Sequence, residues 1–563
     1  MKRSPIVYFL FLFSGITALI YEVVWTRMLT IVFGHTMFSV SVVLAAFMAG
    51  LGFGSYFSGF LTDHIGNNKR YSNGKDLEEG LLEGRKAATA LLFYGWVEIA
   101  IFLACSIVSL ILFEFSAIYS WFSSFIPESV AIQNTVKFLF AFGLMFIPTS
   151  LMGATLPMIS KYFITDNTKL GTQVGVLYGI NTLGAAVGCF LTGFFLIAAF
   201  GVLQTVLIAG LLNLFIGISA IRIYQESAEY DQNIRLPHFT RPSFEWREKQ
   251  KVWIVISFVC GFTALAYEVL WTRLLVFSIS STVYSLSMML GVFLLGIMLG
   301  SWLVVTVFRS NLNLRAVLIC LQASIGFYVI VSLYNMDKLL SSPWNGYNLQ
   351  NPIATFGQYF LDASALMFFP TIALGMSFPI LIKMISGSHQ NIGKGTGLIY
   401  GANTFGAILG SLSAGFLLLP RLGAQQSLLL VATLNLIMML YLYRTSSYLT
   451  SALRKMVTVV MAGIIVAVNM GMPSNLLDRF FMRDSTGHRD INKLLYFKEG
   501  LTDTVAVFKD NYGILDPDAK RLITNGLSMS AVNLIASRYM KLLAHTPIML
   551  VDNPKDILVV CFG

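Results

Sequence analysis

The sequence predicts an all-α polytopic membrane protein of two parallel six-helix halves, followed by a β-rich module and the beginning of an α/β domain. Three observations lead to this prediction. Only 12% of the 563 residues are charged, about half the share found in a soluble protein. Apolar runs of about 20 residues, the length that spans a bilayer, recur along most of the chain. Finally, 21 of the 66 charged residues (38 basic and 28 acidic) lie in residues 473–563, a density typical of a soluble domain.

Twelve apolar runs are interpreted as transmembrane spans. They lie at 6–26, 37–61, 88–114, 135–160, 172–198, 202–222, 252–272, 283–308, 315–334, 358–385, 394–419 and 425–443. A shorter thirteenth run at 456–472 is either a further span or an interfacial helix. We therefore expect a first six-span repeat in 1–222, a cytoplasmic linker in 223–251, a second repeat in 252–444 and this ambiguous segment in 445–472.

An internal duplication relates the two halves. Residues 15–29 (GITALIYEVVWTRML) return as 261–275 (GFTALAYEVLWTRLL) with eleven of fifteen positions identical. The motif YGINTLGAAVG at 178–188 likewise returns as YGANTFGAILG at 400–410. Because six spans bring the chain back to its starting side, the two halves have the same orientation. Parallel six-span repeats are the arrangement of major facilitator transporters, so the membrane part is expected to be transporter-like.

Basic residues predict the orientation of the chain. Lys and Arg gather at the N-terminus and in the connections that follow every second span, and such basic segments stay in the cytoplasm. The N-terminus is therefore predicted to be cytoplasmic. The same rule accounts for the net charge of +10 without a nucleic acid, so the expected partner is the lipid bilayer. The sequence leaves the oligomeric state open.

The duplicated motif carries an ionisable residue inside the first span of each half. A charged side chain there costs about 2.5–3.5 kcal/mol on insertion scales and points to function by default. We expect the two carboxylates to converge on a central cavity that suits polyamines or other small organic cations, with neighbouring aromatic rings adding cation–π contact. The alternative is a structural ion pair with the motif arginine, or an arginine that reaches the membrane surface. The candidate residues are Glu22, Trp25, Arg27, Glu268, Trp271 and Arg273.

Other polar residues inside the spans are further candidates for this cavity. Glu98 lies at mid-depth of the third span, where it either bonds a neighbouring helix or belongs to a proton or cation path. The duplicated YGxNTxG motif adds two Tyr and Asn pairs, for which helix packing is the alternative. These are Tyr178 with Asn181 and Tyr400 with Asn403. The five cysteines are scattered without paired spacing, so no metal site is expected.

The soluble tail is predicted to contain strands followed by a helix. Residues 494–510 hold two stretches that alternate apolar and polar side chains, and a short strand at 521–526 closes on Asn-Gly, a hairpin signal. Residues 530–545 are predicted to form a helix. The β-rich module thus occupies 473–550, and 551–563 is predicted to turn into the first buried strand of a Rossmann-like domain.

In these segments the chain resembles the membrane-fused branch of the spermidine synthase family, the polyamine aminopropyltransferases. The resembling pieces are YFKEGLTDTVAV (496–507), LITNG (522–526), YMKLLAHTPIML (539–550) and NPKDILVVCFG (553–563). The resemblance implies transfer of an aminopropyl group from decarboxylated S-adenosylmethionine to putrescine, in a Rossmann-like domain that follows the β module. It implies a substrate-binding role for Tyr539 and a cofactor-loop role for Gly563.

The chain departs from the family pattern where substrates bind. Asp503, Asn525 and Met529 stand at positions that the family fills with Gln, Asp and Gln, and its Tyr-His-Glu motif ends here in Met540 and Lys541. The later residues of the cofactor site are missing. We therefore expect a chain truncated at the start of the catalytic domain that holds no cofactor itself. Decarboxylated S-adenosylmethionine would be a co-substrate only of the complete enzyme.

Three functions follow from these observations. Family membership predicts a membrane-bound spermidine synthase-like transferase whose catalytic domain is incomplete in this chain. The two YEVxWTR motifs predict instead a transporter or sensor of polyamines or other organic cations. The third interpretation is an inactive membrane anchor. Whether the chain acts as an enzyme therefore stays open.

Overall fold

The computed structural model describes most of the membrane part and much of the soluble tail. The described residues are 5–33, 37–64, 76–115, 118, 130–163, 170–228, 248–279, 283–310, 312–340, 352–385, 392–446, 451–473, 476–477, 494–500, 503–510, 519–525, 527–551 and 555–556. Gly563 lies outside them, as does most of the strand expected in 551–563.

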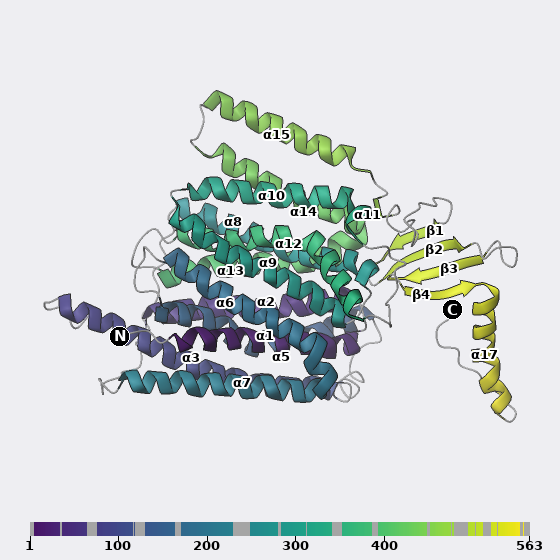
Figure 1. The fold of residues 1–563 in the computed structure, drawn as a ribbon, viewed down its shortest axis with the longest axis horizontal. Coiled ribbons are helices and arrows are strands. Elements are labelled where there is room, and N and C mark those ends of the chain that lie inside the picture. Colours follow the sequence, from purple (N-terminus) through teal and green to yellow (C-terminus); the bar gives the residue numbers. More distant parts are fainter. Residues whose placement is uncertain are drawn as a thin grey trace.

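Thirteen long helices form the described membrane part (Figure 1). Those of the first half are α1 (Ile6–Phe33), α2 (Met37–His64), α3 (Asp76–Phe113), α5 (Val130–Phe163), α6 (Leu170–Leu191) and α7 (Ile197–Ala228). Those that follow are α8 (Glu248–Ile279), α9 (Val283–Arg309), α10 (Leu314–Tyr334), α12 (Pro352–Ile385), α13 (Ile392–Leu412), α14 (Leu419–Arg444) and α15 (Ser451–Gly471). The short elements are the π-helical turns η3 (Thr192–Leu196) and η4 (Ser413–Leu418) and the helix α11 (Met336–Leu339).

Ten continuous helical stretches in the described residues are long and apolar enough to cross a membrane. Two of them, Thr172–Glu226 and Leu398–Arg444, contain 55 and 47 residues, or about 80 and 70 Å at about 1.5 Å per residue. The bilayer core is about 30 Å thick, so each is long enough for two crossings. Each contains one glycine with positive φ, Gly201 (77°) and Gly423 (74°), at which two helices meet in a bend. The protein is an integral, multi-pass membrane protein.

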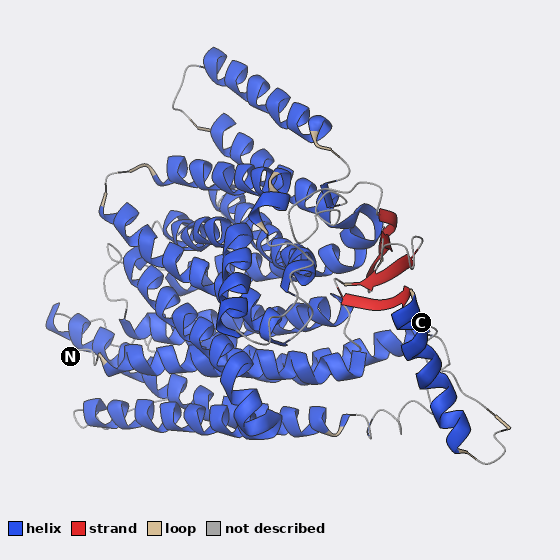
Figure 2. Ribbon diagram, turned by 45° about the vertical axis from the view of Figure 1, so that its right-hand side comes forward, coloured by secondary structure: helices blue, strands red, loops and turns tan. Residues whose placement is uncertain are grey.

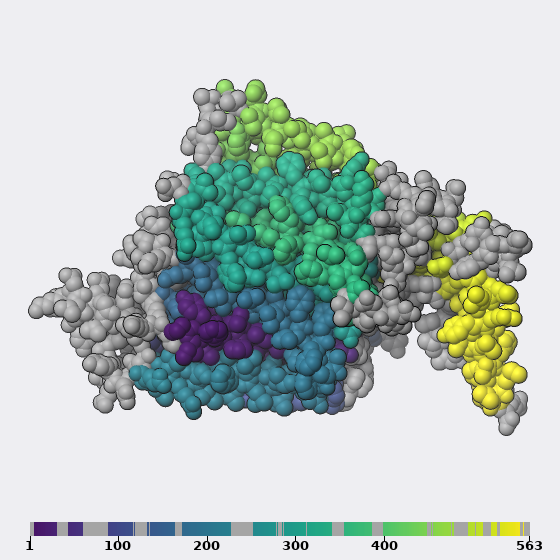
Figure 3. Space-filling model, viewed as in Figure 1, coloured from purple at the N-terminus to yellow at the C-terminus, as the bar shows by residue number. Residues whose placement is uncertain are grey.

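The thirteenth apolar run forms helix α15, which lies antiparallel to α14. Near the start of α15, the Arg454 side chain bonds the carbonyl of Ser446, just after α14 ends. Beyond its other end, the Pro473 carbonyl accepts a hydrogen bond of 2.5 Å from Gln425, at the start of α14. The helix therefore runs the full length of its neighbour. Figure 3 shows it along the outside of the helical body, as a lipid-facing span would lie.

The two halves repeat the same packing. Within them, α1 packs on α6 as α8 packs on α13, and α3 packs on α7 as α10 packs on α14. Between them, α2 packs on α13 and α6 packs on α9. These contacts join the second helix of one half to the fifth of the other, in both directions, as a two-fold axis requires. The fold thus has the parallel-repeat, major-facilitator-like arrangement that the duplication predicts.

Duplicated glycines allow these helices to approach closely. Gly50 of α2 lies against the Thr149 side chain of α5, and Gly296 of α9 lies against the Thr371 side chain of α12. A Cβ atom at either glycine would overlap the threonine. Small residues at helix contacts are the usual means of close packing inside a membrane, so both glycines are required by the fold.

The described tail forms an antiparallel meander with the strand order β1-β2-β3-β4. The strands are β1 (Leu494–Glu499), β2 (Thr504–Asp510), β3 (Ala519–Thr524) and β4 (Leu527–Val532). Thr524 pairs with Leu527, so the Asn-Gly signal is a two-residue hairpin turn, and Asn525 has the positive φ (52°) that such a turn needs.

The prediction of a helix at 530–545 is wrong at its start. Pairing with β3 holds β4 in the sheet as far as Val532, and the helix α17 runs from Leu534 to Leu550. The cap between them is Asn533, whose side chain accepts a hydrogen bond of 2.7 Å from the backbone N–H of Ala536. The hairpin therefore decides where the helix can begin.

The meander lies at the end of the helical body opposite to the N-terminus, in both ribbon views (Figures 1 and 2). Thirteen helices that each cross the membrane once would have this consequence, because each crossing takes the chain to the other side. With the cytoplasmic N-terminus that the basic residues predict, the meander would then be extracytoplasmic.

Candidate functional site

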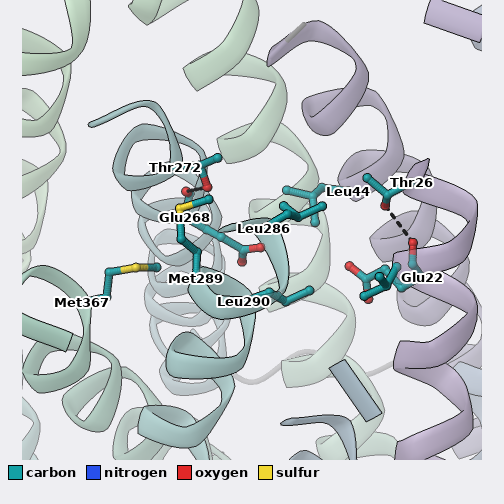
Figure 4. Close-up of a pocket in the computed structure, with 10 residues that line it drawn as sticks. Glu22, Thr26, Leu44, Glu268, Thr272, Leu286, Met289, Leu290 and Met367 are labelled. Atoms are coloured by element: carbon teal, nitrogen blue, oxygen red, sulfur yellow. Dashed lines mark hydrogen bonds between the residues drawn. The ribbon is translucent and has the colours of Figure 1, made fainter. Parts of the chain in front are cut away.

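The structure brings Glu22 and Glu268 to one cavity between the two halves. Glu22 lies on α1 and Glu268 lies on α8. Figure 4 shows their carboxylates directed into a shared space from opposite walls. The cavity is narrow: its volume of about 430 Å³ counts every gap between the lining atoms as well as space open to solvent. The rest of its lining is Val23, Thr26, Leu44, Thr272, Leu286, Met289, Leu290 and Met367.

The two carboxylates are buried without a compensating charge. Glu22 is 4% exposed and Glu268 is 7% exposed, and they are near enough to repel one another when both are ionised. Among the described residues, neither carboxylate accepts a hydrogen bond or forms an ion pair. Two unneutralised carboxylates in an apolar cavity are unfavourable, so a positively charged guest would stabilise this arrangement.

The aromatic residues of the motif lie away from the cavity. Tyr21 stacks on Trp25 with ring centroids 5.5 Å apart, and the Trp25 indole N–H donates to Ser109 Oγ at 2.8 Å. In the second half Tyr267 stacks on Trp271 at 4.9 Å. Each pair belongs to the core of its own half. On a helix the Tyr and Trp, four residues apart, lie about 40° apart, whereas the Glu lies about 100° from the Tyr and about 60° from the Trp. The cavity lining thus provides no cation–π contact from these rings.

The two motif arginines have different surroundings. Arg27 is exposed, whereas Arg273 is 2% exposed and donates to the Gly500 carbonyl, after β1, at 2.9 Å. The adjacent Glu499 accepts a hydrogen bond of 3.0 Å from the backbone N–H of Ala424, at the start of α14. The second arginine therefore links the membrane part to the meander instead of pairing with the glutamate of its own motif.

Glu98 belongs to a separate polar cluster inside the first half. Its side chain is 0% exposed and lies where α1, α3 and α7 meet. Ser14 Oγ donates to one carboxylate oxygen at 2.6 Å, and Asn213 Nδ2 donates to the other at 2.6 Å. Glu98 is not part of the cavity lining. Glu98 therefore forms an acidic site of its own, apart from the cavity that holds Glu22 and Glu268.

The second half has an uncharged version of that cluster. Gln322 of α10 stands where Glu98 stands in α3, and its carbonyl accepts a hydrogen bond of 2.7 Å from Asn435 Nδ2. The Tyr267 hydroxyl donates to Asn435 Oδ1 at 2.8 Å. The duplication thus preserves the site but replaces its carboxyl group by an amide.

Tyr178 and Tyr400 meet at the boundary between the halves. Both rings contact Phe378 of α12, with centroid separations of 5.1 and 5.7 Å. We call these three residues the inner aromatic layer. They bridge α6, α12 and α13 rather than lining the cavity with Glu22 and Glu268.

A second group of rings, the outer aromatic layer, also joins the halves. It consists of Phe194 in η3, Tyr284 in α9 and Phe356 in α12, with centroids 5.0 to 5.7 Å apart. Along α12, Phe356 precedes the cavity residue Met367 by 11 positions, and Phe378 of the inner layer follows it by 11. At 1.5 Å per residue each layer lies about 16 Å from the cavity along the helix. The cavity therefore sits between two aromatic layers.

Asn181 and Asn403 lie in helix contacts. Their backbone carbonyls face Gly15 of α1 and Gly261 of α8, where a Cβ atom would overlap them. The Asn181 side chain also donates to the Phe11 carbonyl at 3.3 Å. These positions hold the first and fifth helices of each half together and do not reach the cavity lining.

Sequence reasoning missed three buried polar residues. Asp362 of α12 is 1% exposed and accepts hydrogen bonds from Ser278 and, at 3.0 Å, from Gln358. Asp362 could have been identified from the sequence, because it is an acidic residue inside the apolar run 358–385. Asn213 and Asn435 are equivalent at the 222-residue offset of the YGxNTxG motif, so the duplication could have revealed them too.

The described part of the tail contributes no residue to the lining of the cavity. Tyr539 lies on α17 and is 62% exposed, and Gly563 is outside the described residues. In the part of the chain that the structure describes, no group of three or more His, Cys, Asp or Glu side chains could hold a metal ion.

No family model and no curated protein matches the chain. Among solved structures it is similar to the human organic anion transporter MFSD10, with 11% identity over 78% of this chain and 99% of that one, at a TM-score of 0.45. It is also similar to a bacterial homologue of the iron transporter ferroportin in an outward-facing state (11% identity, 81% and 99% covered, TM-score 0.47). A third similar structure is an auto-inhibited peptide transporter of the POT family, with 13% identity over 83% of this chain and 98% of that one, at a TM-score of 0.38. Likeness this remote says nothing about a substrate.

Proposed function

We propose that the protein is a carrier of small organic cations, with Glu22 and Glu268 as the cation-binding groups. The observation that carries this proposal is the cavity between the halves, where the two carboxylates meet. Carboxylates bind ammonium groups by charge-assisted hydrogen bonds. Their burial strengthens that attraction, because the local dielectric constant is low.

The rest of the lining supports a ligand with an apolar middle and charged ends. Leucine and methionine side chains make up most of the wall and suit a chain of methylene groups. The hydroxyls of Thr26 and Thr272 donate to the backbone carbonyls of Glu22 and Glu268 at 2.7 Å each, which leaves their oxygen lone pairs as acceptors. An ammonium group has donors only. A diamine or polyamine therefore matches the site better than an anion or a sugar.

The two aromatic layers support a path to each side of the membrane. Both join one half to the other, so a rocking motion of the halves would separate one layer while closing the second. Such alternating access around a fixed central site is the usual mechanism of parallel-repeat transporters. In this motion, Phe378 would separate from its partners in the inner aromatic layer while Phe356 stays in contact in the outer layer, and then the reverse.

The test is uptake of labelled spermidine and putrescine by liposomes that contain the purified protein. A Glu22→Gln, Glu268→Gln double variant removes both charges with almost no change of volume. Loss of a desolvated charge partner costs about 2 kcal/mol or more, so we expect at least a roughly 30-fold loss of amine binding for each carboxylate. The control is Glu226→Gln, an exposed glutamate at the end of α7, which should leave uptake unchanged.

Uptake or binding that survives the double change would overturn the proposal, provided that the variant elutes as the intact protein. Equal losses in the double variant and in the Glu226→Gln control would do the same. They would show that the effect follows from lost surface charge and not from the cavity.

The transferase that the family resemblance implies is a separate prediction. It rests on the sequence pieces that resemble the family, and the meander does not test it. Binding of decarboxylated S-adenosylmethionine would need residues that follow the first Rossmann-like strand. A complete reading frame with such a domain, together with aminopropyl transfer to putrescine by the purified protein, would be the evidence for it.

A further inference from the structure

The cluster around Glu98 has the chemistry of a carboxylate site without a counter-charge. Each carboxylate oxygen accepts one short hydrogen bond, from Ser14 and from Asn213. Among the buried residues that the structure describes, Arg273 is the basic one, and it lies in the other half. Burial of an ionised carboxylate that is bonded only by neutral donors costs free energy, so binding of a positive charge would stabilise this group.

One polar atom beside this carboxylate, Asn213 Oδ1, is buried and has no hydrogen bond among the described groups. The Tyr21 hydroxyl lies nearby and interacts with the Cys105 thiol. Their equivalents in the second half, Asn435 Oδ1 and the Tyr267 hydroxyl, bond to one another at 2.8 Å. The second half therefore has a satisfied neutral network. The first half retains an unused acceptor next to its acid.

An unpaired amide oxygen is what a protonated carboxyl group needs. We propose that Glu98, with Ser14, Asn213 and Tyr21, forms a proton-binding site inside the first half, separate from the cation cavity. A proton from water adds to the carboxylate oxygen that now accepts from Asn213. The Asn213 amide then rotates by half a turn, so that Oδ1 accepts from the new O–H group. Ser14 continues to donate to the other oxygen, and the rotated Nδ2 faces the region of the Tyr21 hydroxyl.

The groups around the site cannot take this proton in place of Glu98. Tyr21 of α1 and Tyr94 and Cys105 of α3 are the titratable groups that interact with it, and all three are neutral when protonated. From α7 the facing group is Asn213, which does not titrate. The other titratable side chains described on α1, α5 and α7, apart from Glu22 at the cavity, lie toward the helix ends: Tyr8, Arg27, Lys137, Lys161, Tyr162, Arg222, Tyr224 and Glu226.

Infrared difference spectroscopy of the purified full-length protein tests the proposal without any transported substrate. The sample is titrated from about pH 10 to about pH 4, a range that covers an ordinary glutamate and one shifted by several units. We expect a carboxylic-acid C=O band to grow as a carboxylate band falls. Glu98→Gln, which gives the first half the amide of the second, should abolish that band. The same titration of the Glu22→Gln, Glu268→Gln protein should retain it.

Ser14→Ala provides a second variant should Glu98→Gln fail to fold. It keeps the acid but removes the donor to its carbonyl oxygen, so the band should persist and move to higher frequency. A band that is absent across the range, or that Glu98→Gln and Ser14→Ala both leave unchanged, overturns the proton site. Because the readout needs no amine, failure here leaves the carrier proposal standing. Failure of the carrier likewise leaves this site standing.

Discussion

Replacing Arg273 by alanine should detach the meander from the membrane part. Arg273 is buried near the C-terminal end of α8 and donates to the Gly500 carbonyl at 2.9 Å. It also lies close enough to Glu499 and Asp503 to attract both. The duplication provides a matched control, because Arg27 occupies the same position in the first motif and is exposed. Two identical substitutions can therefore be compared in one protein.

The size of the effect follows from the contacts that are lost. A hydrogen bond from a charged donor contributes about 1.5–3 kcal/mol, and leaving a buried charge without its partner costs about 3–5 kcal/mol. Since Glu499 keeps its bond of 3.0 Å from the Ala424 N–H, we expect about 2–4 kcal/mol for Arg273→Ala. That loss lowers the docking equilibrium by about 30- to 1000-fold.

Hydrogen exchange over residues 494–510 is the appropriate measurement, because docking protects the turn between β1 and β2. Exchange of the Gly500 region should accelerate by that same factor in Arg273→Ala. Arg27→Ala should leave it unchanged, since an exposed arginine makes no comparable contact. Equal acceleration in both variants, or none in either, would show that the link does not depend on the buried guanidinium.

Two further predictions concern the fold. Gly50→Ala should destabilise the protein by about 1–3 kcal/mol, because its Cβ would overlap Thr149. Gly143→Ala, which has nothing within 4 Å, should leave the melting temperature unchanged, and a similar shift for both would refute the packing argument. Asn525→Asp should weaken the meander by about 1–3 kcal/mol, because Asn525 donates to Asp503 Oδ1 at 2.6 Å and a second carboxylate there would repel it. An unchanged urea midpoint for that variant would contradict this reasoning.

The number and position of the helices could be predicted because the apolar composition of each span reflects the lipid environment around it. A run of about 20 apolar residues must span the bilayer as a helix whatever surrounds it, so local composition was sufficient. The hairpin turn at Asn525 was predictable for a similar reason, since few residues adopt its backbone conformation. The start of α17 could not be predicted in this way. It depends on how far β4 pairs with β3, and that contact cannot be read from the residues near the start of the helix.

The duplication was sufficient to predict the two-half architecture and the convergence of Glu22 and Glu268. A duplicated motif in parallel repeats must be related by the axis between them. What each residue of the motif contacts depends on the packing of the helices and could not be predicted from the motif. Within one helix turn, Glu22 lies at the cavity and Trp25 lies in the core of the first half. Of the two equivalent arginines, Arg27 is exposed and Arg273 is buried. The reason is physical: the two repeats have the same helices but different neighbours, because the described contacts of the meander are with α8 and α14 of the second half.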